Sequence, residues 1–401
     1  MPAYTAERSY PDMHELRKSF ENIFGLSDGL RFYSAPGRVE LGGNHTDHQH
    51  GCVLAASINL DMRAAAALNG MNVIRVKSEG YPQIDIDLSD LSPRPYDENT
   101  TTALVRGIAD AFLRRGKTVL GVDMYIVSDV LRGSGLSSSA AFEVLVGTAL
   151  SDLLDCNFSA PEIAEIGQYA ECEHFGKPSG LMDQMASSVG GVVAIDFSEN
   201  PAKIEKIEVD LKKLGYDLAV IDAGADHVDL TDEYASIPHE MKSVAKMFGR
   251  EFLGEVAENE FYDRIAEVRS KLGDRAVLRA VHFFRDSRRA VMEANCLKNN
   301  DFEGFLKLIR ESGDSSFKYL QNIYVSGAVE NQAMAYALAV CEELLCGRGA
   351  VRIQGGGFGG TLEAFVPCDM TEQFKAGIEK MIGKNMCSIL TIRKNGGVRI
   401  G

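Results

Sequence analysis

The stretch Arg132-Gly-Ser-Gly-Leu-Ser-Ser-Ser-Ala-Ala141 lies between a strand-like run that ends near Val127 and an apolar helical run that continues to about Leu154. A strand, a flexible glycine turn and a hydroxyl-rich helix start form an anion site, because unpaired amides and the helix dipole point towards the turn. Serines at a helix start are equally typical of simple N-capping. The segment therefore predicts either a phosphate-binding turn or an ordinary capped junction.

This turn does not match the usual nucleotide-binding fingerprints. No Gly-Lys-Ser/Thr follows its glycines, which excludes a Walker loop, and the third glycine of a dinucleotide fingerprint is absent. A phosphate would be held by backbone amides and by the hydroxyls of Ser137, Ser138 and Ser139. One of these hydroxyls can also bind a phosphate-bound Mg²⁺ ion.

A second glycine cluster is found in Arg352-Ile-Gln-Gly-Gly-Gly-Phe-Gly-Gly-Thr361. Its formal match to G-x-G-x-x-G is misleading, because the segment from 361 to 366 is strand-like and not helical. Glycines this dense permit positive φ and close approach, either to a phosphate or to another part of the protein. We expect a strand, a loop that faces a ligand, and a second strand.

Polar and ionisable side chains are concentrated in Ala35-Pro-Gly-Arg-Val-Glu-Leu-Gly-Gly-Asn-His-Thr-Asp-His-Gln-His-Gly51, directly after a strand-like run. Strand ends crowded with such residues are common places for a site. The histidines lack a companion His or Cys pair with zinc-ligand spacing. Arg38 and Asp47 form either a local ion pair or a pair that recognises an anion and sugar hydroxyls.

A candidate functional acid lies in Gly180-Leu-Met-Asp-Gln-Met-Ala-Ser187. Apolar residues flank Asp183, so its carboxylate is either a helix cap or a partly buried functional group. The helix that Pro161 opens ends at Gly176-Lys-Pro, and Glu171 lies on its last full turn.

The rest of the chain mixes helical and strand-like patterns without a regular β-α-β period, which favours α+β packing with a domain division near residue 200. The predicted helices cover residues 13–24, 102–115, 276–294 and 328–345. The predicted strands cover residues 31–35, 71–76, 83–88, 119–127, 189–197, 204–211 and 218–221.

Composition limits the class of partner. The 401 residues are 45% hydrophobic, enough for two ordinary cores, and the net charge of −15 opposes binding to nucleic acid or an anionic membrane. Eight cysteines without a Cys-x-x-Cys pair indicate reduced thiols. The chain shows neither a signal region nor an apolar run of about 18 residues, so we expect a cytoplasmic protein. We also expect a monomer whose partners are small molecules.

These segments, in this order, resemble the galactokinase branch of the GHMP kinases. The resemblance covers nearly the whole chain and includes Asp232-Glu-Tyr234 and the segment from Arg279 to Arg289. It implies a two-domain α+β fold with the active site in the cleft between the domains. Residues 1–199 would carry the sugar signature, which runs from Gly37 to Asp47, and the ATP-binding glycine loop. Residues 200–401 would form a helix-rich part with a ferredoxin-like sheet, and would carry the second glycine cluster as the third motif of the family.

The resemblance implies ATP- and Mg²⁺-dependent phosphorylation of the C1 hydroxyl of galactose. Asp183 would face that hydroxyl as a base or an orienter, Arg38 would lie between Asp183 and the phosphoryl group, and Ser139 and Glu171 would hold Mg²⁺. The implied sugar contacts are Asn44, His45, Asp47, Gly180 and Tyr234. The implied ATP contacts are Arg132, Gly133, Ser134, Gly135, Leu136, Ser137, Ser138, Ser139, Gly356 and Gly357.

The chain departs from the family pattern at Asn44, where galactokinases usually carry a glutamate. An amide would no longer repel a C6 carboxylate, and plant galacturonate kinases resemble this chain in reading Asp47-His-Gln49, so galacturonate is the alternative substrate. A sugar- and ATP-sensing regulator is an alternative of another class, although the complete serine run and Asp183 favour turnover. Mevalonate and homoserine kinases lack the sugar signature at His45-Thr-Asp47.

Overall fold

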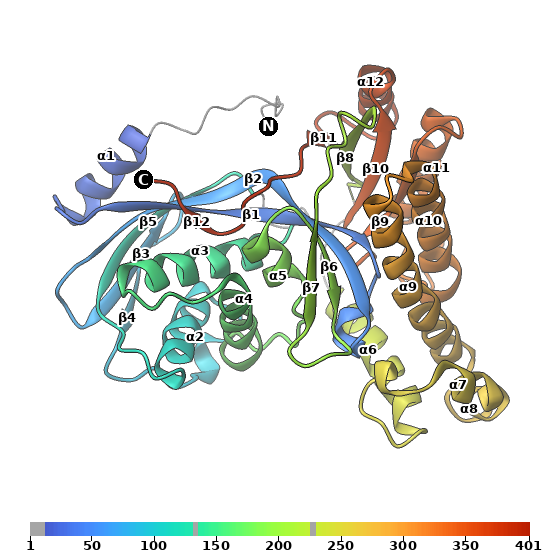
Figure 1. Cartoon of the computed structure of the whole chain (residues 1–401), viewed down its shortest axis with the longest axis horizontal. Coiled ribbons are helices and arrows are strands. Elements are labelled where there is room, and N and C mark those ends of the chain that lie inside the picture. Colours follow the sequence, from blue (N-terminus) through green and yellow to red (C-terminus); the bar gives the residue numbers. More distant parts are fainter. Residues whose placement is uncertain (1–12, 131–134, 225–229) are drawn as a thin grey trace.

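The computed structural model describes residues 13–130, 135–224 and 230–401. Two β-sheets with helices packed against them form the molecule (Figure 1). The first sheet has the strands β1 (Arg31–Gly42), β2 (Cys52–Leu68), β3 (Val73–Ser78), β4 (Ile84–Asp87), β5 (Val122–Ser128), β6 (Val192–Asp196), β7 (Lys203–Ile207) and β12 (Val398–Arg399). The second has β8 (Tyr216–Asp222), β9 (Ala350–Gln354), β10 (Thr361–Pro367) and β11 (Cys387–Leu390).

The described helices flank the two sheets. They are α1 (Met13–Phe24), α2 (Thr101–Arg114), α3 (Ser138–Leu153), α4 (Ala160–Tyr169), α5 (Met182–Val189), α6 (Thr231–Lys246), α7 (Glu258–Asp263), α8 (Ile265–Leu272), α9 (Asp274–Lys298), α10 (Phe302–Ser315), α11 (Ala333–Leu345) and α12 (Thr371–Met381). Short helical turns include η1 (Asp47–Gln49), η4 (Leu253–Glu255) and two π-helical turns, η3 (Ala170–His174) and η5 (Ser316–Leu320).

The long strand β2 is the centre of the first sheet. It pairs antiparallel with β1, β5 and β6, and nearly all of its side chains are buried. Helices α2 to α5 cover one face of this sheet, and α1 packs on the other (Figure 1). The pairing is antiparallel except between β3 and β5, so the expectation of an α+β fold is confirmed.

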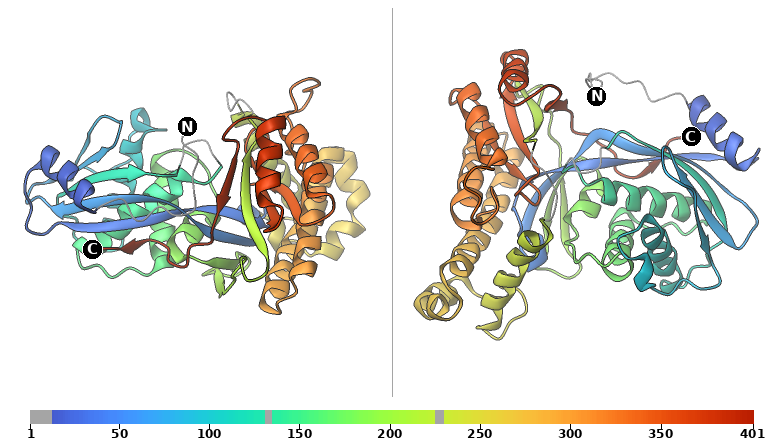
Figure 2. Two further views of the ribbon diagram at one scale, coloured as in Figure 1. Left: turned by 90° about the horizontal axis from the view of Figure 1, so that it is seen from above. Right: turned by 180° about the vertical axis from the view of Figure 1, so that it is seen from behind.

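The second sheet has the order β11-β8-β10-β9, and α10, α11 and α12 pack against it. Figure 2 shows from two further sides that this helical layer and the α2 to α5 layer lie at opposite ends of the molecule, with β1 and β2 running between them. One buried apolar cluster includes Tyr33 and Leu54 of the first sheet together with Leu218 and Phe365 of the second. The two halves therefore share a continuous core.

The sheets do not divide at residue 200. Strand β7 pairs with β6 and strand β12 pairs with β1, so two strands from the later part of the sequence lie in the first sheet. The Arg393 side chain also donates to Ser34 and Asp61 of that sheet. The division of the chain into residues 1–199 and 200–401 stays a prediction, and the last residues pack on the first half.

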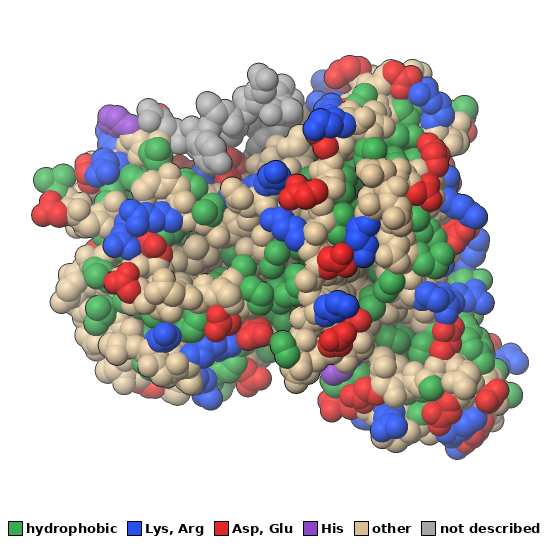
Figure 3. Space-filling model, in the orientation of Figure 1, with side chains coloured by type: hydrophobic (Ala, Val, Ile, Leu, Met, Phe, Trp, Pro, Cys, Tyr) green, Lys and Arg blue, Asp and Glu red, His purple; other side chains and the backbone are tan. Residues whose placement is uncertain are grey.

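On the face drawn in Figure 3, acidic and basic side chains are interspersed over both halves. All eight cysteines are free thiols. Among the described residues, no helix is long and apolar enough to cross a membrane.

Candidate active site

Arg38 on β1 and Asp183 in the first turn of α5 form a two-bond ion pair. Nε of Arg38 donates to Oδ1 of Asp183 at 2.6 Å, and a terminal nitrogen donates to Oδ2 at 2.8 Å. The guanidinium is buried, whereas the Asp183 side chain keeps 30% of its surface exposed, so the carboxylate retains an open face. The helix-cap alternative fails, because Asp183 lies inside α5 and binds Arg38.

The first glycine turn joins this pair. Gly135 accepts a hydrogen bond from Arg38 through its carbonyl at 2.7 Å, and the Leu136 carbonyl accepts from the Arg38 backbone amide at 3.1 Å. The Ser137 hydroxyl donates to Asp183 and does not cap α3, which corrects the capping expectation for this serine. Arg132, Gly133 and Ser134 lie outside the described residues.

Opposing effects act on the pKa of Asp183. Burial works to raise the pKa, but the Arg38 guanidinium and the Ser137 hydroxyl outweigh it and hold the pKa below its usual value. Asp183 is therefore an ionised carboxylate at neutral pH. It is a weak base and a good hydrogen-bond acceptor.

Asp47 and Gly180 are in direct contact. A side chain at Gly180 would begin 1.6 Å from Oδ2 of Asp47, so the carboxylate fills the space that a larger residue would take. Burial and the nearby Asp183 raise the pKa of Asp47 to about 6. The Asp47 and Asp183 carboxylates are thus near enough to interact electrostatically, and both are hydrogen-bond acceptors for a polyhydroxylated ligand.

Glu171 meets the start of α3. Ser139 Oγ lies 3.3 Å from Oε1 of Glu171, and Lys177 Nζ binds the same oxygen at 2.8 Å. The other oxygen accepts from Ser179 at 2.6 Å and from Gln184 at 2.9 Å, which fixes the plane of the carboxylate. Adjacent hydroxyl and carboxylate oxygens are ligands that Mg²⁺ prefers, so these residues fit the ion.

No group of three or more His, Cys, Asp or Glu side chains with the arrangement of a metal site occurs among the described residues.

Asn44 is fully buried, and protein groups occupy its amide. The nitrogen donates to Glu40 at 2.8 Å and to the Gly355 carbonyl at 2.6 Å. The oxygen accepts from Asn322 at 2.9 Å and from Ser316 at 3.2 Å. The expected sugar contact therefore has its hydrogen-bonding groups engaged inside the protein, so this geometry does not favour a direct contact.

His45 is also engaged internally. Its Nε2 lies 3.1 Å from the Gly356 carbonyl, and its Nδ1 lies 3.3 Å from Nε2 of His48. Burial lowers the pKa of His45 to about 4 and that of His48 to about 3, so both rings are neutral. Tyr234, the remaining expected sugar contact, donates to the Gly357 carbonyl at 3.0 Å and keeps its oxygen lone pairs available.

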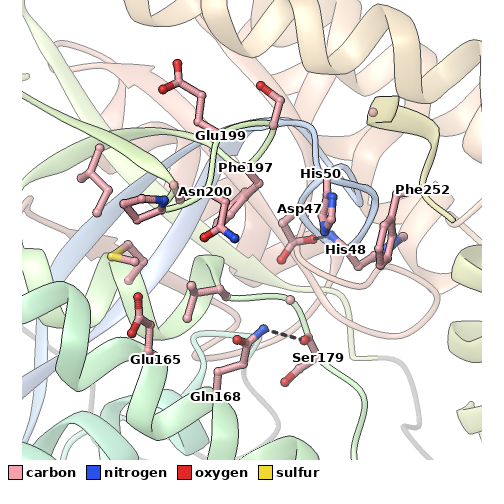
Figure 4. Close-up of a pocket in the computed structure, with 18 of the residues that line it drawn as sticks. Asp47, His48, His50, Glu165, Gln168, Ser179, Phe197, Glu199, Asn200 and Phe252 are labelled. Carbon is pink, nitrogen blue, oxygen red and sulfur yellow. Dashed lines mark hydrogen bonds between the residues drawn. The ribbon is translucent and has the colours of Figure 1, made fainter. Parts of the chain in front are cut away.

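A cavity of about 730 Å³ opens beside Asp47 (Figure 4). It lies where the α4 and α5 region meets η1, α6 and the η4 segment, and its size is within the range of small-molecule sites. Gln168 and Ser179, joined by a 3.1 Å hydrogen bond, line one wall. Residues on the other walls include Asp47, His48, Phe197, Asn200 and Phe252.

Comparisons with known proteins identify the family. The galactokinase galactose-binding signature matches residues 18–68, and the N-terminal domain of the GHMP kinases matches residues 103–191. A galactokinase of Glaesserella parasuis serovar 5 is 30% identical over 386 residues, which cover 94% of each chain. The chain belongs to the galactokinase family.

Two further proteins extend the match. A galactokinase of Actinobacillus pleuropneumoniae is 31% identical over 356 residues, which cover 85% of this chain and 86% of that protein. The crystal structure of Lactococcus lactis galactokinase complexed with galactose matches with a TM-score of 0.82 at 23% identity, covering 97% of this chain and all of that one. This galactokinase-family chain therefore has the GHMP kinase fold.

The structure also assigns contacts that sequence reasoning missed. Lys177 and Gln184 bind Glu171. Both lie close to Asp183 in the sequence, and this proximity is the signal that could have identified them. His48 contacts His45 of the sugar signature, and Asn322 contacts Gly356 of the second glycine cluster. Asn322 has no neighbouring motif that could have indicated this contact.

Proposed function

We propose that the protein transfers the terminal phosphoryl group of ATP to the anomeric C1 hydroxyl of galactose. The observation that carries the proposal is the Arg38–Asp183 pair, held against the glycine turn at Gly135 and next to Asp47 and Gly180. Relatives that share about 30% of their sequence over nearly the whole chain are galactokinases, which supports the same substrate.

The protein's own residues act mainly by alignment and charge. Phosphoryl transfer has a loose transition state, so the attacking hydroxyl needs little deprotonation before the bond to phosphorus forms. Asp183 accepts the hydrogen bond of the C1 hydroxyl and takes its proton as the bond between phosphorus and the leaving ADP oxygen breaks. Its lowered pKa suits this orienting role better than that of a strong base.

Arg38 neutralises charge at the phosphoryl group while it holds Asp183 in place. Asp47 accepts hydrogen bonds from sugar hydroxyls remote from C1. Ser139 and Glu171 would hold Mg²⁺, which supplies further charge neutralisation on the ATP phosphates when bound.

The experiment is an ATP-consumption assay with galactose, galacturonate, N-acetylgalactosamine and arabinose, with the product identified by ³¹P NMR. We expect the highest kcat/KM for galactose and a product phosphorylated at C1. If the protein binds ATP and galactose but turns over none of the four sugars, it is a sugar- and ATP-sensing protein and not a kinase.

Galacturonate is the second candidate, because plant galacturonate kinases resemble this chain in reading Asp47-His-Gln49. A higher kcat/KM for galacturonate than for galactose in the same assay would establish it. Both outcomes leave the C1-kinase chemistry unchanged.

A further inference from the structure

The residues that follow β1 hold the second glycine cluster by its carbonyl groups. Asn44 donates to the Gly355 carbonyl at 2.6 Å, and the Gly356 carbonyl lies 3.1 Å from Nε2 of His45. Asn322 donates to that same carbonyl at 3.3 Å. Consecutive peptide units of the loop are thus fixed from the side of the sugar signature.

A hydrogen-bond relay behind His45 sets its tautomer. The Leu253 amide donates to Oε1 of Gln49 at 3.2 Å, so the Gln49 nitrogen faces Nδ1 of His48, also at 3.2 Å. His48 must then carry its proton on Nε2 and donate to Nδ1 of His45. His45 carries its proton on Nε2 and donates to Gly356, because a carbonyl can only accept.

Planar trans peptides turn each N–H away from the carbonyl of the same unit. Because the carbonyls of Gly355 and Gly356 point to Asn44 and His45, the amides of Gly356 and Gly357 point away from the sugar signature. Gly355 and Gly357 have positive φ values of +65° and +79°, whereas Gly356 between them does not. Backbone that alternates between left-handed and right-handed conformations in this way directs successive amides into an anion-binding concavity. A side chain at Gly355 would begin 3.9 Å from Arg38, so the loop borders the catalytic pair.

We propose that Asn44, His45 and His48 are positioning residues that hold the glycine loop so that the amides of Gly356 and Gly357 bind the terminal phosphate of ATP. The proposal rests on the proposed kinase function. It gives Asn44 and His45 a task different from sugar contact, and it gives His48 a task that the sequence did not suggest.

The test combines His48→Phe, which keeps the ring shape but removes the donor to His45, with His48→Gln, whose amide can still donate. For His48→Phe we expect kcat to fall about tenfold or more, as for other lost anion-binding donors. Affinity for a non-hydrolysable ATP analogue should weaken, while calorimetric affinities for ADP and galactose stay within about twofold. His48→Gln should retain most of the activity, and His239→Phe, at an exposed histidine of α6, is the control.

Nitrogen-15 NMR of the wild-type protein provides a measurement that needs no variant. It should show both His45 and His48 neutral and protonated on Nε2. His45 protonated on Nδ1, or a loss confined to galactose affinity in His48→Phe, would overturn the proposal. Failure of every sugar to react would instead defeat the kinase function, because the nucleotide affinities and the tautomers are measured without turnover.

Discussion

Asp183 has an ionised carboxylate because Arg38 and Ser137 bind both of its oxygens. Asp183→Asn keeps the shape but loses the charge and one acceptor. We expect kcat to fall by about 10² to 10⁴, the usual contribution of a positioned acid–base group. Galactose affinity, measured by calorimetry, should change little.

The matched control is Asp152→Asn, which weakens another arginine–aspartate pair, between Asp152 and Arg31. Asp152 lies near the C-terminal end of α3, whereas the catalytic pair lies beside the N-terminal end of that helix. It should leave kcat near the wild-type value. A kcat for Asp183→Asn within about threefold of wild type would remove Asp183 from the chemistry.

Asn44 provides a second prediction at the scale of one residue. A glutamate there would direct a carboxylate towards the Glu40 side chain and the Gly355 carbonyl, both of which now accept hydrogen bonds from the amide. We expect Asn44→Glu to lower Tm and to lower kcat with galactose and galacturonate by the same factor. Unchanged Tm with a tenfold or larger shift in the kcat/KM ratio, on the order of 1.4 kcal/mol, would restore a sugar-contact role.

At the scale of elements, the contact between the turn before α5 and η1 predicts that Gly180 is intolerant of substitution. An alanine methyl group would overlap the Asp47 carboxylate, which must move away. We expect Gly180→Ala to raise KM for galactose about tenfold or more, since Asp47 would lose its position. The control is Gly29→Ala, because nothing lies within 4 Å of a side chain at that position.

Sequence patterns predicted elements where periodicity was clear and missed several where it was not, among them α12, β11 and the long strand β2. The helix predicted at 102–115 is α2 (Thr101–Arg114), and the strand at 119–127 is β5 (Val122–Ser128). Strand β2 was not predicted. Its alanine-rich sequence is buried on both faces, so it has none of the alternation that marks a half-exposed strand.

At the scale of the whole molecule, the meeting of Arg38 and Asp183 depends on packing between segments 145 residues apart. Motif order and family resemblance predicted this meeting, because each motif keeps its place in a known fold. The burial of Asn44 was not predictable in this way. Its partners Asn322 and Ser316 come from the helical half and carry no motif.

A buried charge network joins the two halves at Arg352. Its guanidinium binds Glu40 of β1 at 2.7 Å and lies 3.6 Å from Glu363 of β10, whose oxygens accept no hydrogen bond from any described residue. Burial raises the pKa of Glu363 from an ordinary 4.5 to about 8. The folded protein thus keeps a proton that the unfolded chain releases, so the free energy of unfolding falls as pH rises from about 4.5 to about 8.

Glu363→Gln imitates the protonated acid at every pH and should remove this dependence. We expect the variant to match wild type near pH 4 and to exceed it increasingly as pH rises to about 8, by about 1.4 kcal/mol for each pH unit, measured by denaturant unfolding at each pH. Glu372→Gln, at an exposed position of α12, should leave the pH profile unchanged. Equal pH slopes for wild type and Glu363→Gln would mean that Glu363 is ionised in the folded protein and that Arg352 holds both carboxylates as charged partners.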